Sequence, residues 1–130
     1  MLRRGVRHQA VTAESDGDLP WIYGAAIRAA SGEETAARAT VAAFSARSSN
    51  GHSDGARRRA LMVAAVRNAL ADSPSEPLAR LPADEREAIG LVRILGLKVD
   101  EVAALLERDA REVKALMREG LTRLAAAYYP

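Results

Sequence analysis

The segment from Leu81 to Leu124 reads LPADEREAIGLVRILGLKVDEVAALLERDAREVKALMREGLTRL, and its pattern decides the fold. Apolar residues recur at spacings of three and four in three consecutive stretches, which is the pattern of helices with one buried side each. We expect the first helix to end at Gly96 in the left-handed conformation, and Asp109 to cap the third helix. The sequence therefore predicts a helix-turn-helix module. The predicted buried residues are Ala88, Leu91, Val92, Leu95, Val99, Val102, Ala103, Leu106, Val113, Leu116, Met117, Gly120, Leu121 and Leu124.

The third predicted helix carries a row of basic residues on the side opposite its apolar stripe. Arg111, Lys114 and Arg118 follow one another at spacings of three and four. Such a row can reach the phosphates and base edges of a DNA groove. The alternative is a solvated face whose cations pair with neighbouring glutamates. Acidic residues outnumber basic ones from Leu81 onward, giving about −1, whereas DNA-binding domains are usually basic. The pattern thus indicates the fold more strongly than it indicates DNA binding.

The motifs of this segment resemble region 4 of bacterial sigma factors of the extracytoplasmic-function group. The resemblance implies a module that binds promoter DNA and works with RNA polymerase. It places Arg111, Lys114 and Arg118 on the DNA, Arg86 and Arg108 on phosphates, and Lys98 near the turn. The residues that carry it are Leu81-Pro82, Glu85-Arg86-Glu87-Ala88, Gly96-Leu97, Glu101-Val102-Ala103, Val113-Lys114, Gly120-Leu121 and Leu124.

Four positions depart from that family pattern. Lys98 stands where the family usually has a small polar residue, and Glu107 stands where it has glycine. Glu112 and Glu119 replace a common threonine and a common arginine. Carboxylates on a helix that faces a groove repel phosphate, so these changes are expected to lower DNA affinity.

Three further helices are predicted before this module. The first runs from Leu19 to Ala30, with Trp21 and Tyr23 as core or interface anchors. The second follows Ser31, which we expect to be the N-cap of a capping box with Glu34, and reaches about residue 47. The third covers Gly55 to Ala71. Their predicted inner residues are Ile22, Ala26, Ala29 or Ala30, Ala36, Ala39, Thr40, Ala43, Phe44, Met62, Ala65, Val66, Ala69 and Leu70.

This N-terminal half resembles sigma region 2 more faintly, at residues 23–28, 36–44 and 65–70. The polar residues that the family uses to bind the polymerase clamp are replaced by Ala37, Arg38, Val41 and Ala42. The sequence has no aromatic residue between Phe44 and Tyr128, although stacking on flipped bases needs aromatic faces. The resemblance therefore implies a shortened scaffold without the chemistry of promoter melting and clamp binding.

The expected organisation is all-α, with two small helical bundles. Residues 1–18 form an arm, 19–72 the first bundle, 73–80 a linker rich in Ser and Pro, and 81–130 the helix-turn-helix domain. Residues 48–54 are a polar loop. Arg57, Arg58 and Arg59 begin a helix, where the dipole disfavours cations, and this hints at a phosphate or an acidic partner.

Composition excludes several classes of function. The 130 residues contain no cysteine, which removes thiolate metal sites and disulfides and fits a reducing cytoplasm. Both histidines, His8 and His52, fall in predicted flexible segments without a nucleophile or metal-ligand partner, and no glycine-rich phosphate loop is present. We therefore expect neither an enzyme nor a cofactor, metal or small-molecule substrate. No export signal and no membrane span are expected either.

Three hypotheses remain. The first is a sigma-like regulator that binds promoter DNA through the third helix. The second is a sigma mimic or decoy that binds an anti-sigma factor, another regulator or the polymerase instead of DNA. The third is a dimeric helix-turn-helix repressor, which requires a palindromic site with half-sites about one helical turn apart.

Overall fold

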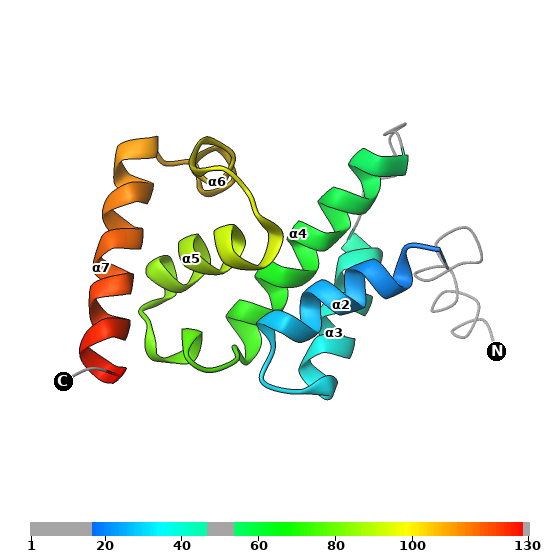
Figure 1. Ribbon diagram of the computed structural model, residues 1–130. Coiled ribbons are helices and arrows are strands. Elements are labelled where there is room, and N and C mark those ends of the chain that lie inside the picture. The colour runs from blue at the N-terminus through cyan, green and yellow to red at the C-terminus, as the bar shows by residue number, and fades with distance from the viewer. Residues whose placement is uncertain (1–16, 47–53, 129–130) are drawn as a thin grey trace.

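The computed structural model of the protein describes residues 17–46 and 54–128, and in this part the chain is all-α (Figure 1). The predicted polar loop 48–54, apart from its last residue, and both histidines lie outside these residues, as does most of the predicted arm. The six helices expected from the sequence are all present in this part. They are α2 (Leu19–Ala29), α3 (Glu33–Ala46), α4 (Asp54–Asp72), α5 (Ala83–Leu95), α6 (Val99–Leu106) and α7 (Ala110–Tyr128), with a short 3₁₀ helix η2 (Leu78–Arg80) before α5.

Helices α2, α3 and α4 pack against one another as the first bundle (Figure 1). The inner residues predicted for α2 and α3 are buried, and in α4 Leu61 joins them while Met62 is only partly buried. Trp21 does not belong to the core, because 56% of it is exposed. The predicted capping box at Ser31 is also wrong. The helix α3 begins two residues later, and the Ser31 hydroxyl lies 2.6 Å from that of Ser73.

Helix α5 is the centre of the second bundle, because it contacts α4 on one side and α7 and α6 on others (Figure 1). This position explains why Ile89 and Ile94 are buried in addition to the predicted Ala88 and Leu91. A single stripe of apolar residues packs against one neighbouring element, whereas a central helix needs apolar residues on several of its sides. At the other end of the segment, the prediction that Leu121 is buried is wrong, since 53% of it is exposed.

Glycines allow α5 to approach both of its neighbours closely. A Cβ atom at Gly90 would lie 2.7 Å from Leu70 Cδ1 of α4, and one at Gly120 of α7 would lie 2.4 Å from Ile89 Cδ1. Both distances are far below a van der Waals contact, so a larger side chain at either position requires the Leu70 or the Ile89 side chain to move. One continuous set of buried residues therefore runs from α2 through α5 to α7.

The segment between the bundles is held by backbone contacts. Ser31 N donates to Ser73 O at 2.8 Å, and Ser75 N donates to Ala29 O at 2.8 Å. Leu78 of η2 is buried within the common core. The linker predicted at 73–80 is thus packed against the end of α2, and the domain boundary there stays a prediction.

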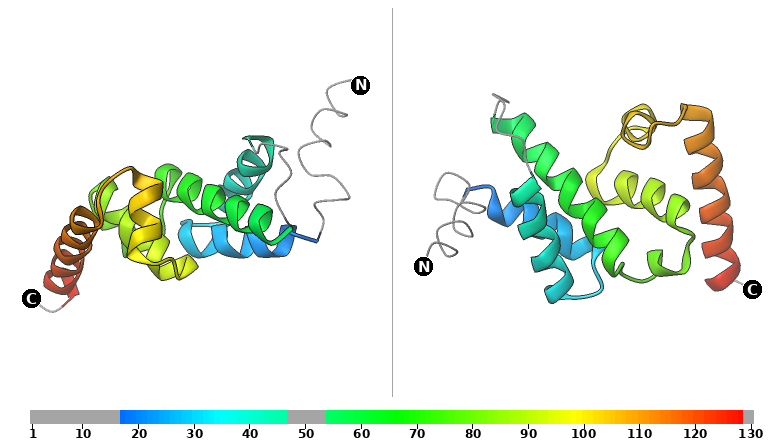
Figure 2. Two further views of the ribbon diagram at one scale, coloured as in Figure 1. Left: turned by 90° about the horizontal axis from the view of Figure 1, so that it is seen from above. Right: turned by 180° about the vertical axis from the view of Figure 1, so that it is seen from behind.

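Helix α7 lies at the end of the molecule opposite α2 and α3, with α5 between them (Figures 1 and 2). It packs on α5 and α6, and its remaining surface faces outward. Among the described helices, none is long and apolar enough to cross a membrane.

Candidate nucleic-acid interface

The two turns of the helix-turn-helix have left-handed backbone conformations. Gly96 has φ 66°, as predicted, and its N–H donates to Val92 O at 2.9 Å to close α5. Glu107 closes α6 with φ 54°, a conformation that costs a side-chain-bearing residue about 1–2 kcal/mol. The turn is therefore formed with the expected geometry, but at a strained residue.

Lys98 immediately precedes helix α6, and its backbone N–H donates to Glu101 Oε1 at 2.8 Å. This hydrogen bond, together with the nearby Arg59 guanidinium, lowers the pKa of the Glu101 carboxyl. Glu101 also forms an ion pair with Arg59, which reaches it from α4. The start of α6 is thus fixed both locally and to the first bundle, and the Lys98 side chain remains exposed.

Helix α7 begins with a reciprocal capping box. Glu112 N donates to Asp109 Oδ1 at 3.2 Å, and Asp109 N donates to Glu112 Oε1 at 3.3 Å. The prediction that Asp109 is the N-cap is confirmed. Glu112, which seemed from the sequence to oppose DNA binding, has a structural function at the start of this helix.

The three basic residues of α7 form an exposed row, which we call the basic stripe: Arg111, Lys114 and Arg118. Within residues 17–46 and 54–128 none of them makes an ion pair, so the alternative of a face neutralised by neighbouring glutamates is not what the structure shows. Successive residues of a helix are rotated by about 100° around its axis. The mean direction of Glu112 and Glu119 is therefore roughly 120° from the mean direction of the basic stripe. The two glutamates and the basic stripe thus lie on different sides of α7.

Two exposed residues next to the stripe escaped the sequence reasoning. Leu121 follows Lys114 by seven residues and Thr122 follows Arg118 by four, so both share its side of the helix. Thr122 donates its hydroxyl to Arg118 O at 2.8 Å. Spacing alone could have placed both residues on the outer face, but the apolar character of Leu121 suggested burial.

The remaining predicted contacts are arranged differently. Arg108 pairs with Asp84 at 2.9 Å and with Glu112 at 3.5 Å, which joins α5 to the start of α7. Arg86 donates to the carbonyl oxygens of Leu70 (3.2 Å), Leu78 (3.3 Å) and Leu81 (2.8 Å). These contacts give Arg86 a structural function at the junction of the bundles, so it is a poor candidate for holding phosphate.

The arginine triplet at the start of α4 also has partners inside the molecule. Arg57 and Arg58 lie 3.5 and 3.0 Å from the buried carboxylate of Asp18, just before α2. Arg58 lies over the Trp21 ring, 5.0 Å from its centre, and Arg59 pairs with Glu101. The predicted conflict with the helix dipole is therefore resolved by ion pairs to other elements.

Comparison with known proteins agrees with this geometry. Residues 77–124 match the family model for sigma-70, region 4, and they span η2 and α5, α6 and most of α7. No curated protein and no solved structure matches the chain. The matched segment contains both turns and the basic stripe. Residues 77–124 of this protein are therefore similar to region 4 of sigma-70, and in the structure they form a helix-turn-helix.

Proposed function

We propose that the chain is a sigma-factor-like transcription regulator that binds promoter DNA through the basic stripe of α7. The observation that carries the proposal is a set of three exposed cations on the outer face of the last helix of the segment that matches region 4. None of them makes an ion pair with any residue that the structure describes. Free guanidinium and ammonium groups can release counterions from phosphates, whereas groups already paired with carboxylates cannot. Lys98, exposed at the start of α6, is a further candidate for a phosphate contact.

We further propose that contacts with core polymerase are weakened. The outward face of α3 carries Ala37, Arg38, Val41 and Ala42, which are all exposed. Of these four residues only Arg38 is charged, and it pairs with Glu34 at 2.7 Å and with Asp72 at 3.0 Å. Three apolar side chains and one paired cation at these four positions offer little for a polar, charge-specific contact. We also expect a weak ability to melt promoters, because no aromatic residue lies between Phe44 and Tyr128 to stack on flipped bases.

The test is a salt titration of DNA binding by the full chain. A duplex pool is first enriched for bound sequences, and fluorescence anisotropy then gives log K against log salt concentration. Lys114→Gln removes one free cation, so we expect the slope to fall by about 0.9 and the affinity to drop. Arg38→Gln removes the same charge from α3 and is expected to leave the slope unchanged. Equal slopes for wild type and Lys114→Gln would take Lys114 out of the interface.

A protein partner is the second candidate function. Leu121 is an exposed large apolar side chain beside the basic stripe, and a mixed apolar and basic surface suits a protein contact as well as a groove. If the chain is a sigma mimic, nuclease-treated extracts should yield a stable complex with an anti-sigma factor or another regulator. In that case Leu121→Asp should break the complex, and the salt titration should show no appreciable DNA binding.

A further inference from the structure

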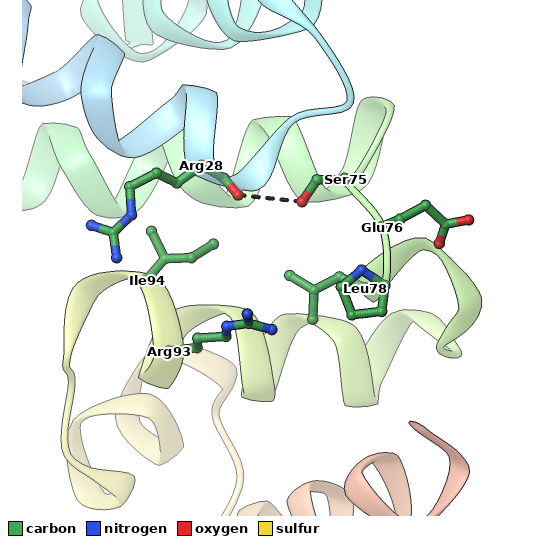
Figure 3. A pocket seen from close by; sticks show the side chains of 7 residues that line it. Arg28, Ser75, Glu76, Leu78, Arg93 and Ile94 are labelled. Carbon is green, nitrogen blue, oxygen red and sulfur yellow. Dashed lines mark hydrogen bonds between the residues drawn. The ribbon is translucent and has the colours of Figure 1, made fainter. Parts of the chain in front are cut away.

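A small pocket lies at the junction between the two bundles (Figure 3). Its volume is about 240 Å³, several times the ~30 Å³ that one water molecule occupies in the liquid. It is therefore large enough for an oxyanion that carries a small organic group. The lining residues come from α2, from the segment before η2 and from α5. They are Arg28, Ser75, Glu76, Pro77, Leu78, Arg93 and Ile94.

Two arginines from different elements line this pocket. Arg28 belongs to the last turn of α2 and Arg93 to the last turn of α5. Both side chains are exposed, and neither forms an ion pair with any residue in the described ranges. The helix dipole favours a cation at the end of each helix, but it does not account for two such cations at one pocket.

The other lining groups leave room for a negative charge. Among the residues that the structure describes, Glu76 is the only carboxylate in the lining, and it pairs with Arg80 at 3.5 Å. Figure 3 shows its carboxylate directed away from Arg28 and Arg93. The Ser75 hydroxyl donates to Arg28 O at 3.2 Å, which fixes the chain beside the pocket. Leu78 and Ile94 are buried and provide an apolar floor.

We propose that this pocket binds a small, doubly charged oxyanion of the phosphate class between Arg28 and Arg93. Planar guanidinium groups match the oxygens of phosphate in a bidentate geometry, and two of them balance two negative charges. The ligand would touch α2 and α5 together, so binding would favour the packed arrangement of the two bundles. The site is remote from the basic stripe on α7 and does not depend on DNA binding.

The test uses inorganic phosphate as the probe and succinate as a dicarboxylate control, at constant ionic strength and at a pH above the second pKa of phosphate, where both carry two negative charges. We expect phosphate to raise the thermal unfolding midpoint in a saturable way and to shift the side-chain Nε–H resonances of Arg28 and Arg93. Each of Arg28→Gln and Arg93→Gln should weaken the apparent affinity about tenfold. A response to succinate but not to phosphate would overturn the choice of phosphate chemistry.

A triple variant of the basic stripe, Arg111→Gln with Lys114→Gln and Arg118→Gln, provides the control. It should lose DNA binding and keep the full response to phosphate. If the triple variant loses the phosphate response, the anion binds the stripe and the proposal is wrong. Phosphate also stabilises proteins by exclusion from their surface. An equal, unsaturable rise in wild type and in the Arg28→Gln/Arg93→Gln double variant would mean that only this exclusion operates, which also overturns the proposal.

Discussion

Glu107 adopts a backbone conformation that residues with a side chain disfavour. The helix-turn-helix needs a left-handed residue at the end of α6, and the chain places a glutamate there with φ 54°. At the equivalent point of α5 the chain has Gly96, which adopts φ 66° without a steric penalty. The fold therefore forms in spite of residue 107, because packing of α6 and α7 determines the turn.

Replacing Glu107 by glycine is expected to stabilise the protein. Relief of the left-handed penalty should add about 1 kcal/mol to the free energy of unfolding, after the greater freedom of glycine in the unfolded chain is deducted. Urea unfolding measures the change. Glu107→Ala removes the same charge but keeps a Cβ atom, so it should give no comparable gain. If both variants stabilise equally, the charge of Glu107 and not its conformation is responsible.

At the scale of the element, the short helix α6 is held at its start by a single carboxylate. Glu101 accepts the Lys98 backbone N–H at the start of the helix and pairs with Arg59 of α4. An eight-residue helix is too short to be stable alone, so these contacts and its packing must hold it. The position of the second helix of the module therefore responds to the charge state of Glu101.

The dependence on pH follows from the direction of the pKa shift. Because the folded state lowers the pKa of Glu101 below its ordinary value of 4.5, the associated stability is present above that value. It is lost as pH falls through the folded-state pKa. Between about pH 6 and pH 3, Glu101→Gln should lose less stability than wild type. Asp100→Asn, which removes a carboxylate outside these contacts, should follow the wild-type curve in urea unfolding at each pH.

The accuracy of sequence reasoning also differs between elements. Helix positions, the end at Gly96 and the cap at Asp109 were predictable, because periodicity, glycine and capping residues act within a few residues. The burial of Ile89 and the structural function of Arg86 were not, because they depend on α4 and the linker, which are remote in sequence. The side of α7 that carries the glutamates could be predicted from residue spacing. That the basic stripe makes no ion pair with the described residues could not, because it depends on where the neighbouring elements lie.

At the scale of the whole molecule, the contact between α4 and α5 determines whether the two bundles move as one. Gly90 of α5 lies against the buried Leu70 of α4, and Arg86 donates to the Leu70 carbonyl oxygen. Arg67 of α4 also donates to Glu87 of α5 at 2.5 Å. The face of α3 and the basic stripe of α7 are therefore held at a fixed distance from each other.

Two glycine substitutions separate packing from helix propensity at this contact. Gly24→Ala in α2 places a Cβ in open space, so we expect a gain of about 0.5–1 kcal/mol. Gly90→Ala brings the same gain in helix propensity, but it forces the Leu70 side chain to move, at a cost of about 1–3 kcal/mol. The difference between the two variants in urea unfolding should lie in that latter range. Equal stabilisation by both would mean that α4 and α5 do not pack closely in solution.

The buried side of the first bundle consists mostly of alanine, and this has a calorimetric consequence. Alanine loses no rotamer entropy on folding and exposes little apolar area on unfolding. The heat-capacity change of unfolding should therefore fall below the usual ~12–15 cal/mol/K per residue, and the stability curve of the protein should be flat across temperature. The alanines concerned are Ala25, Ala26, Ala29, Ala30, Ala36, Ala39, Ala43, Ala65 and Ala69.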